Sequence, residues 1–346
     1  MKRNWMMITM VAMGLFMAGC GSNTAEVPVE ETVVEAVVEE VEVSADPVDM
    51  SILALKGPTA MGMVSFMYGV DSGEITDNNY DFSIIAAVDE VAAMLVKGEA
   101  DIAALPANMA SVLYNNTEGA IQVLGVNTLG VLYLVENGDA LESIADLEGK
   151  TIYASGKGAT PEYALMHILA ENNLADSVTI EWKSEHAECV AAVAATEGAI
   201  AMLPEPFVTT AKMQNPDMRV AIDLNDAWEE MQGDVEDKSA LITGVLVANR
   251  GFVEENTEAL EMFMDHYNDS VLYTKEDVMG AAELVGKYEI VTQQVAEIAL
   301  PACNITWVTG DDLVDQLGGY LAVLMEQNPA SVGGALPADD FYYIGE

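Results

Sequence analysis

Two glycine-rich segments contain the residue types best suited to hold a small ligand, and each leads into a predicted helix. They are KGPTAMG at residues 56–62 and GKGATPE at residues 156–162. Glycine lets backbone N–H groups approach a ligand, and a helix N-terminus presents unpaired donors with partial positive charge. Neither segment has P-loop spacing. Each could simply begin a helix, with Thr160 as N-cap and Pro161 first in the second helix. Their recurrence favours ligand contact.

Two strand ends lie at equivalent points of an internal repeat. Residues 89–106 (DEVAAMLVKGEADIAALP) align without gaps with residues 187–204 (AECVAAVAATEGAIAMLP), and a strand, a glycine loop and a helix precede each copy. Ligands of open α/β sheets bind beyond the carboxyl ends of strands. We therefore expect Asn108 and Glu205 to face a cleft between two similar lobes. Glu205 could instead complement the dipole of the helix after Pro206, and the two roles are compatible.

Catalytic and metal-binding patterns are sparse. We expect His167, His186 and His266 to be structural or surface residues, because they lie in predicted helices without metal-ligand spacing. Cys189 and Cys303 are isolated among apolar or small residues and are predicted to be buried, and a disulfide between them remains open. We expect no catalytic residue, metal or cofactor.

Short apolar runs alternate with helical stretches after residue 49, which is typical of α/β proteins with mostly parallel sheets. The strand candidates are residues 51–55, 82–86, 102–105, 121–135, 151–154, 179–182, 200–203, 219–223 and 241–248. The uncharged segment 119–135 suits one long strand or two end to end, crossing between lobes near Asn127 and Thr128. A return crossing is expected at 241–248. The predicted lobes are therefore 49–127 with 246–346, and 128–245.

The composition excludes several classes of function. The chain has 346 residues, of which 51% are hydrophobic, so it can bury a substantial core. Its 57 acidic residues outnumber 13 Lys plus Arg, and the net charge of −44 excludes binding to the phosphate backbone of nucleic acids.

The N-terminus is predicted to direct export. Lys2 and Arg3 precede an apolar run and small residues, as in a signal peptide spanning residues 1–19. The segment Met17-Ala18-Gly19-Cys20 resembles a bacterial lipobox, in which Cys20 would carry lipid; the alternative is an ordinary secretory signal. Residues 20–48 are predicted to be a flexible acidic tether. Removal of residues 1–19 would change the net charge from −44 to −46.

The sequence resembles the solute-binding lipoproteins of bacterial ABC importers, in the group of thiamine-pyrimidine, alkanesulfonate, taurine and nitrate binders. The segments that carry the resemblance are KGPTAMG (from 56), KGEADIAALPANMA (from 97), VNTLGVLYLVENG (from 126), LEGKTIYASGKGATPEY (from 147), AMLPEPFVTTA (from 201), PACNI (from 301) and NPASVGGALPADDFYY (from 328). The resemblance implies a periplasmic-binding-protein type II fold, with two similar α/β lobes joined by crossing strands around a ligand cleft. It also implies ABC permease and ATPase partners.

Three functions are compatible with this resemblance. The first is solute capture by an exported monomer, either periplasmic or anchored by lipid to the outer face of the cell membrane. The alternatives are a lipoprotein that senses a solute and an enzyme of the same fold. Relatives that form the thiamine pyrimidine carry a cysteine-rich cluster, which this chain lacks.

The expected ligand-binding residues come from both lobes and from the first crossing. They are Lys56, Gly57, Thr59, Ala60, Met61, Asn108, Asn127, Thr128, Gly158, Ala159, Thr160 and Glu205. A sulfonate-like solute would depend on Lys56, Lys157 and backbone donors, because no arginine falls in the candidate loops. A pyrimidine or other heteroaromatic amine would bond to Glu205 and stack on an aromatic ring. The scarcity of arginine favours the amine.

Overall fold

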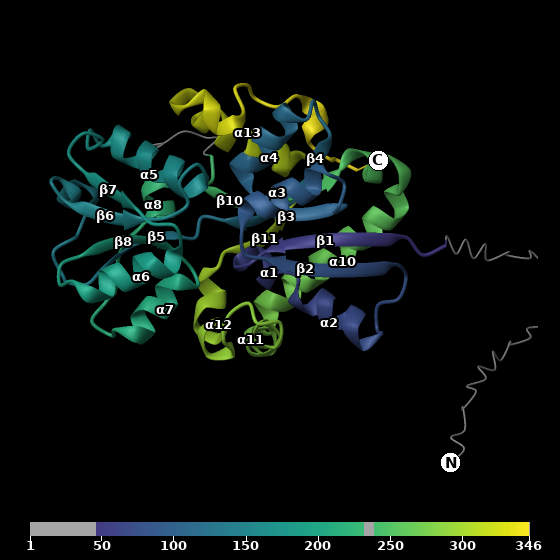
Figure 1. The fold of residues 1–346 in the computed structure, drawn as a ribbon, viewed down its shortest axis with the longest axis horizontal. Coiled ribbons are helices and arrows are strands. Elements are labelled where there is room, and N and C mark those ends of the chain that lie inside the picture. The colour runs from purple at the N-terminus through teal and green to yellow at the C-terminus, as the bar shows by residue number, and fades with distance from the viewer. Residues whose placement is uncertain (1–45, 232–238, 346) are drawn as a thin grey trace, which may run out of the picture. The chain divides into compact units, whose positions relative to one another are not determined.

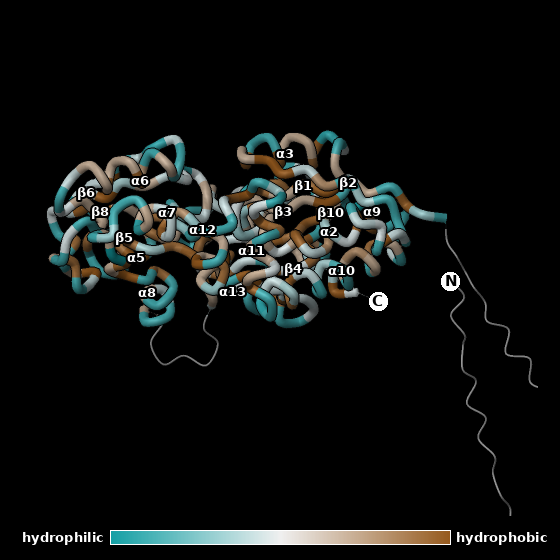
Figure 2. Tube along the Cα trace, turned by 90° about the horizontal axis from the view of Figure 1, so that it is seen from below, coloured by the Kyte–Doolittle hydropathy of each residue, from teal (hydrophilic) through white to brown (hydrophobic). Residues whose placement is uncertain are grey.

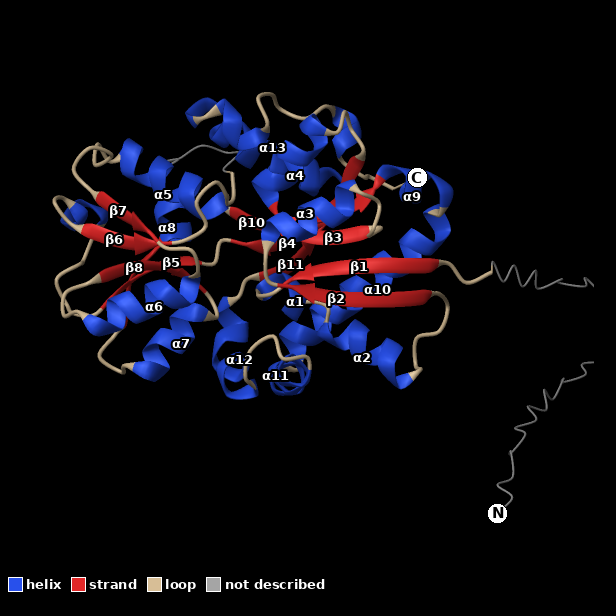
Figure 3. Cartoon of the chain, in the orientation of Figure 1, coloured by secondary structure: helices blue, strands red, loops and turns tan. Residues whose placement is uncertain are grey.

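The computed structural model describes residues 46–231 and 239–345. The predicted signal peptide, Cys20 and the tether up to residue 45 lie outside the described residues. The described chain folds into two α/β lobes, each with one central sheet (Figure 1). Helices cover both faces of each sheet (Figure 3).

The first lobe is built from both ends of the described chain. Its N-terminal elements are β1 (Asp49–Leu55), α1 (Pro58–Met61), α2 (Val64–Ser72), β2 (Asn79–Ile85), α3 (Val88–Val96), β3 (Ile102–Pro106), α4 (Ala107–Asn116) and β4 (Ile121–Leu129). Its C-terminal elements are β10 (Ile242–Asn249), α9 (Arg250–Glu255), α10 (Thr257–Glu276), α11 (Val278–Lys287), α12 (Gln293–Ala299), β11 (Ile305–Val308) and α13 (Gly310–Gln327). The sheet has the strand order β11-β4-β10-β3-β1-β2.

The second lobe is formed by the middle of the chain. It contains β5 (Leu132–Glu136), β6 (Thr151–Ala154), α5 (Thr160–Glu171), β7 (Thr179–Trp182), α6 (His186–Ala195), β8 (Ile200–Pro204), α7 (Phe207–Gln214), β9 (Arg219–Asp223) and α8 (Leu224–Met231). Its sheet has the strand order β7-β6-β8-β5-β9.

The predicted repeat is confirmed. Both aligned segments fold as a helix followed by a strand, α3 with β3 and α6 with β8. The strand order β2-β1-β3 of the first lobe matches β7-β6-β8 of the second. In each sheet an antiparallel strand then lies beside the third repeat strand, β10 beside β3 and β5 beside β8.

Two strand predictions need correction. The sheets are mixed rather than mostly parallel, because β4, β5, β9, β10 and β11 pair antiparallel with their neighbours. In each sheet the three repeat strands pair parallel with one another, and the strand beside the third of them, β10 or β5, runs antiparallel to it. The short strand β11 was not predicted from the sequence. The apolar segment 119–135 forms two successive strands, β4 and β5, separated at Gly130 and Val131, which is one of the two arrangements expected from the sequence.

The two crossings between lobes pack closely. The strand β10 pairs with β4 along most of its length, and Gly244 lies opposite Thr128. A Cβ atom at Gly244 would lie 2.5 Å from Asn127 Oδ1 and 2.8 Å from Thr59 Cγ2. Only glycine leaves room for both side chains at this point.

A hydrophobic core continues from one lobe into the other. One cluster of buried side chains includes Leu105 of the first sheet and Ile152 of the second. Trp228 of α8 packs on Tyr320 of α13 with ring centroids 5.6 Å apart, and both are almost fully buried. In Figure 2 the hydrophobic residues gather along the central strands, and the outer turns are more hydrophilic. The described helices include none that is long and apolar enough to cross a membrane.

Candidate functional site

A cavity of about 170 Å³ lies between the lobes. Its wall is formed by the ends of β1, β3 and β8, the starts of several helices, and both crossings. The lining residues are Leu55, Lys56, Gly57, Pro58, Thr59, Val88, Pro106, Thr128, Val131, Leu132, Gly156, Ala159, Thr160, Pro161, His186, Pro204, Glu205, Pro206, Phe207 and Thr243. Most of the wall is therefore apolar or uncharged, with a few groups able to bind polar atoms.

The first lobe contributes the loop after β1. Gly57 has φ 141°, a conformation open to glycine, and Pro58 begins α1. The Thr59 hydroxyl donates to Leu55 O at 2.6 Å, and Lys56 N donates to Ile85 O at 2.8 Å. These bonds fix the loop at the carboxyl end of β1, where the exposed Lys56 adds a positive charge to the rim.

The second lobe contributes the loop before α5. Gly156 and Gly158 both have φ 81°, and a Cβ atom at Gly156 would lie 2.8 Å from Pro161 Cγ. The N-cap is Ala159 rather than Thr160, which corrects the sequence prediction. Thr160 is instead the first helical residue, and its hydroxyl donates to Asn108 of the other lobe. The positive end of α5 therefore borders the cavity.

His186 is one of several cavity residues that the sequence reasoning missed, together with Phe207 and Thr243. It begins α6, its Nδ1 lies 2.6 Å from Ser155 Oγ, and its ring packs on Phe207 with centroids 4.9 Å apart. Burial lowers the pKa of His186 to about 4, so the imidazole is neutral at neutral pH. If the Ser155 hydroxyl donates to Nδ1, the ring proton lies on Nε2.

The sequence did contain a signal for His186, because it follows the predicted strand at 179–182. Ligands of open α/β sheets bind beyond the carboxyl ends of such strands. The histidine was assigned a structural or surface role for lack of metal spacing, whereas neutral imidazole can bind a solute without metal.

Glu205 combines the two roles proposed from the sequence, which are to face the cleft and to stabilise the start of the following helix. Its side chain is 6% exposed and lines the cavity. Its Oε2 accepts from Thr209 N at 3.1 Å and its Oε1 from the Thr209 hydroxyl at 3.1 Å, so it also caps the first turn of α7. Burial raises the pKa of Glu205, and the hydrogen bonds from Thr209 partly oppose this rise.

Asn108 connects the two lobes beside the cavity. It is 1% exposed and is not part of the cavity wall. Its Nδ2 donates to Ser331 O at 3.2 Å and to Gly158 O at 3.5 Å, and its Oδ1 accepts from the Thr160 hydroxyl at 3.3 Å. Asn108 therefore holds the α5 loop of the second lobe against the first.

The other predicted residues divide into two groups. Lys56, Gly57, Thr59, Thr128, Ala159, Thr160 and Glu205 line the cavity. Ala60 and Met61 are fully buried in the core of the first lobe, and Gly158 N donates to Glu162 Oε2 at 2.6 Å. Asn127 precedes Thr128 in β4, and the Thr128 hydroxyl donates to Asn127 Oδ1 at 3.1 Å. This group supports the wall rather than forming it.

Several chemistries have no basis among the described residues. Residues 46–231 and 239–345 contain no group of three or more His, Cys, Asp or Glu side chains that could hold a metal. Cys189 and Cys303 are buried free thiols, which settles the open question of a disulfide between them. Arg219 pairs with Glu136 and Arg250 with Asp340, so neither arginine belongs to the cavity.

One protein-family model matches more than half of the chain. Residues 74–277 match the model of the family described as "ABC transporter, phosphonate, periplasmic substrate-binding protein". No match was found among curated proteins.

Solved structures match the fold over most of the chain. An ABC transporter protein from Parabacteroides distasonis superposes with TM-score 0.70 and 22% identity, covering 85% of this chain and 98% of its own. The alkanesulfonate-binding protein SsuA from Xanthomonas axonopodis pv. citri, bound to MOPS, has TM-score 0.66 and 17% identity, covering 86% and 99%. The aliphatic sulphonate-binding protein SsuA from Escherichia coli has TM-score 0.67 and 16% identity, covering 85% and 93%. At these identities the likeness establishes the fold alone.

The burial of His186 makes the free energy of unfolding depend on pH. Burial lowers the pKa of His186 from 6.5 to about 4, so the unfolded chain binds more protons than the folded chain between these values. Stability due to neutral His186 is therefore present above pH 6.5 and is lost as the pH falls towards 4. We expect urea unfolding to show that wild type loses about 1 to 2 kcal/mol more than His186→Gln between about pH 7 and pH 5.

A control variant separates the effect of the buried His186 from the general loss of stability in acid. His266→Gln is not expected to reduce this loss, because His266 lies at a surface ion pair with Asp77, 2.9 Å away. Equal losses in wild type and His186→Gln would contradict the buried neutral imidazole.

Proposed function

The chain belongs to the family of periplasmic substrate-binding proteins of phosphonate ABC transporters, and we propose that its solute is a small organic phosphonate or sulfonate held between the lobes. Membership confirms the resemblance found in the sequence and makes the chain the substrate-binding component of an ABC transporter. The family consists of binding proteins rather than enzymes. The observation that carries the proposed ligand class is the set of donors that share one small cavity.

Donors for an oxyanion come from both lobes. The N-terminus of α5 borders the cavity at Ala159 and Thr160, and such a terminus favours negative charge. Neutral His186 and Lys56 lie in the same wall. The hydroxyls of Thr128 and Thr243 also line it, but they donate to Asn127 Oδ1 and Leu129 O and are not counted among these donors. A phosphonate or sulfonate head has several acceptor oxygens, which matches a set of dispersed donors without arginine.

The volume of the cavity and the buried carboxylate of Glu205 narrow the class of solute further. Its volume of about 170 Å³ is below the roughly 300 to 1,000 Å³ of pockets for drug-sized ligands, which favours a solute with few heavy atoms. Glu205 is buried and has hydrogen bonds only from Thr209 among the described residues, so it can accept a further bond from the solute. An amino group on the phosphonate or sulfonate would supply that donor.

A heteroaromatic amine is the second candidate. It would place its amino group on Glu205 and its ring against Phe207, which also lines the cavity. It would leave the donors at the α5 N-terminus without a charged acceptor.

Binding in this cavity would drive closure of the lobes. A solute that touches both lobes binds the closed state better than the open state, and this difference in affinity shifts the population. Asn108 and Thr160 form their hydrogen bond across the lobes beside the cavity. Closure would therefore complete the ligand site and the surface presented to the permease together.

A panel of small probes tests the ligand class. We expect ethylphosphonate, aminomethylphosphonate or ethanesulfonate to raise the melting temperature of the purified protein, and 4-aminopyrimidine to leave it unchanged, because a ligand stabilises the state that it binds. A shift with 4-aminopyrimidine alone would favour the second candidate and contradict the first.

Glu205 is expected to bind the solute directly. For the best aminated probe, Glu205→Gln should weaken affinity about tenfold or more by calorimetry, because a charged acceptor becomes neutral. The amide can still accept from Thr209, so the start of α7 is kept. Glu181→Gln, at an exposed ion pair with Lys183, is the matched control and should bind like wild type. Unchanged affinity in Glu205→Gln would exclude this role.

We further propose that the protein is exported and anchored by lipid on Cys20. The support is the apolar segment within residues 1–19 and the lipobox ending at Cys20, both outside the described residues. Cys20→Ser should move the protein from the membrane fraction to the soluble exported fraction, whereas Ser22→Ala should leave it in the membrane fraction. Membrane retention of Cys20→Ser would contradict the lipobox, and wild type found in the soluble exported fraction would support the ordinary secretory signal.

A further inference from the structure

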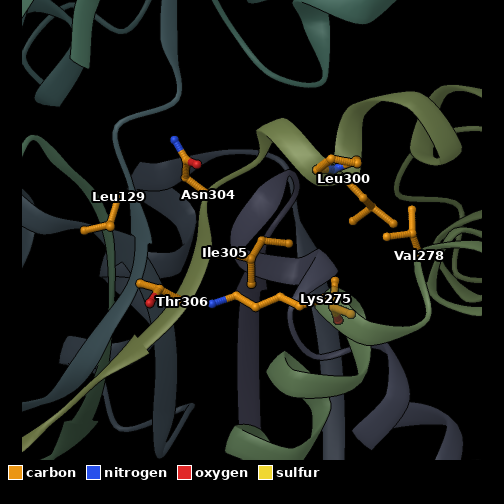
Figure 4. Close-up of a pocket in the computed structure, with 9 residues that line it drawn as sticks. Leu129, Lys275, Val278, Leu300, Asn304, Ile305 and Thr306 are labelled. Carbon is orange, nitrogen blue, oxygen red and sulfur yellow. The ribbon is translucent and has the colours of Figure 1, made fainter. Parts of the chain in front are cut away.

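A second cavity, of about 390 Å³, lies in the first lobe next to the crossing between lobes. It is within the size range of sites for small molecules, roughly 300 to 1,000 Å³. We call it the hinge cavity, and its lining residues are Leu129, Thr274, Lys275, Val278, Leu300, Pro301, Asn304, Ile305 and Thr306. Figure 4 shows these side chains gathered from the end of α10, the start of α11, the turn before β11 and the end of β4.

The wall of the hinge cavity is mainly apolar with one cationic group. Leucine, valine, proline and isoleucine side chains form most of it. Of the polar residues, Thr274 donates its hydroxyl to Ser270 O at 2.8 Å, and Asn304 donates its Nδ2 to Gly130 O at 2.5 Å. The side-chain donors left for a ligand are therefore the Lys275 ammonium, the Thr306 hydroxyl and the second N–H of the Asn304 amide.

Lys275 is free to bind an anion. In Figure 4 its nitrogen points across the cavity towards Thr306. Within residues 46–231 and 239–345, no carboxylate lies within ion-pair distance of its ammonium. The neighbouring Asp277 instead accepts from Gly280 N at 3.0 Å, at the start of α11. Lys275 is exposed and lines the cavity, so its ammonium can pair with an anionic group that enters from solvent.

The hinge cavity also adjoins parts of the chain that join the lobes. Leu129 N donates to Asn304 O at 3.1 Å, so the cavity wall is bonded to the first crossing. The Tyr133 hydroxyl of the second lobe donates to Ala302 O at 3.3 Å, beside Pro301. The wall of the hinge cavity is therefore hydrogen-bonded both to the first crossing and to the second lobe.

We propose that the hinge cavity is a second binding site, for a small organic anion with one carboxylate or sulfonate and a short apolar chain. The anionic group would bind Lys275 and Thr306, and the apolar chain would pack on Val278, Leu300 and Ile305. Because its wall is bonded to the first crossing, occupancy would alter the affinity of the cavity between the lobes, and the effect would be reciprocal.

The test is an NMR titration with hexanoate, following the methyl groups of Leu129, Val278, Leu300 and Ile305. We expect saturable shifts at these methyls that are also present in Glu205→Gln, where the first site is impaired. Lys275→Gln should weaken hexanoate binding by about two- to fivefold through loss of the ion pair. Val278→Trp should fill the cavity and abolish binding, with an unchanged melting temperature as evidence of folding.

Lys97→Gln is the matched control, because Lys97 is an exposed lysine of the same lobe that follows α3. It should bind hexanoate like wild type. Shifts that do not saturate, that appear only at the first site, or that survive in Lys275→Gln at full affinity would overturn the proposal.

Discussion

The pairing of β4 with β10 is the constraint on which the molecule depends. These antiparallel strands belong to the first sheet, and the chain enters and leaves the second lobe at their ends. Their close approach requires Gly244, where a side chain would collide with Asn127 and Thr59. The pairing therefore places Thr128 and Thr243 of the two crossings in the same cavity wall. It also brings the carboxyl ends of β1 and β3 towards those of the second sheet.

From this geometry follows a site that neither lobe could form alone. The first lobe supplies Lys56 and Thr59, and the second supplies His186, Glu205 and the N-terminus of α5. The lobes meet through a buried aromatic contact of Trp228 with Tyr320 and through the hydrogen bonds of Asn108 with Gly158 and Thr160. Binding of the proposed solute in this cavity would therefore favour the same arrangement of the lobes as the packing beside it. That coupling is what a binding component needs if the permease is to distinguish the loaded protein from the empty one.

Much of this architecture could be predicted from the sequence, and the failures have physical causes. The repeat identified α3 with β3 and α6 with β8, because both copies keep the same apolar spacing. The antiparallel pairing of β10 could not be inferred, since alternation along one strand does not reveal the direction of its neighbour. Glu205 was found because it follows a buried strand and a proline. His186 was missed because its role depends on burial between Ser155 and Phe207, which are distant in sequence. Asn108 was chosen for the right strand end, but its amide bonds across the lobes rather than lining the cavity.

The proposal that the cavity between the lobes holds a small oxyanion is best tested by high-resolution mass spectrometry of molecules released when the natively purified protein is denatured. We expect a small phosphonate or sulfonate, identified by a phosphorus or sulfur atom in its elemental composition. The His186→Gln, Glu205→Gln double variant should release much less of it. Release of a pyrimidine or another solute with neither element, in stoichiometric amount, would contradict the account.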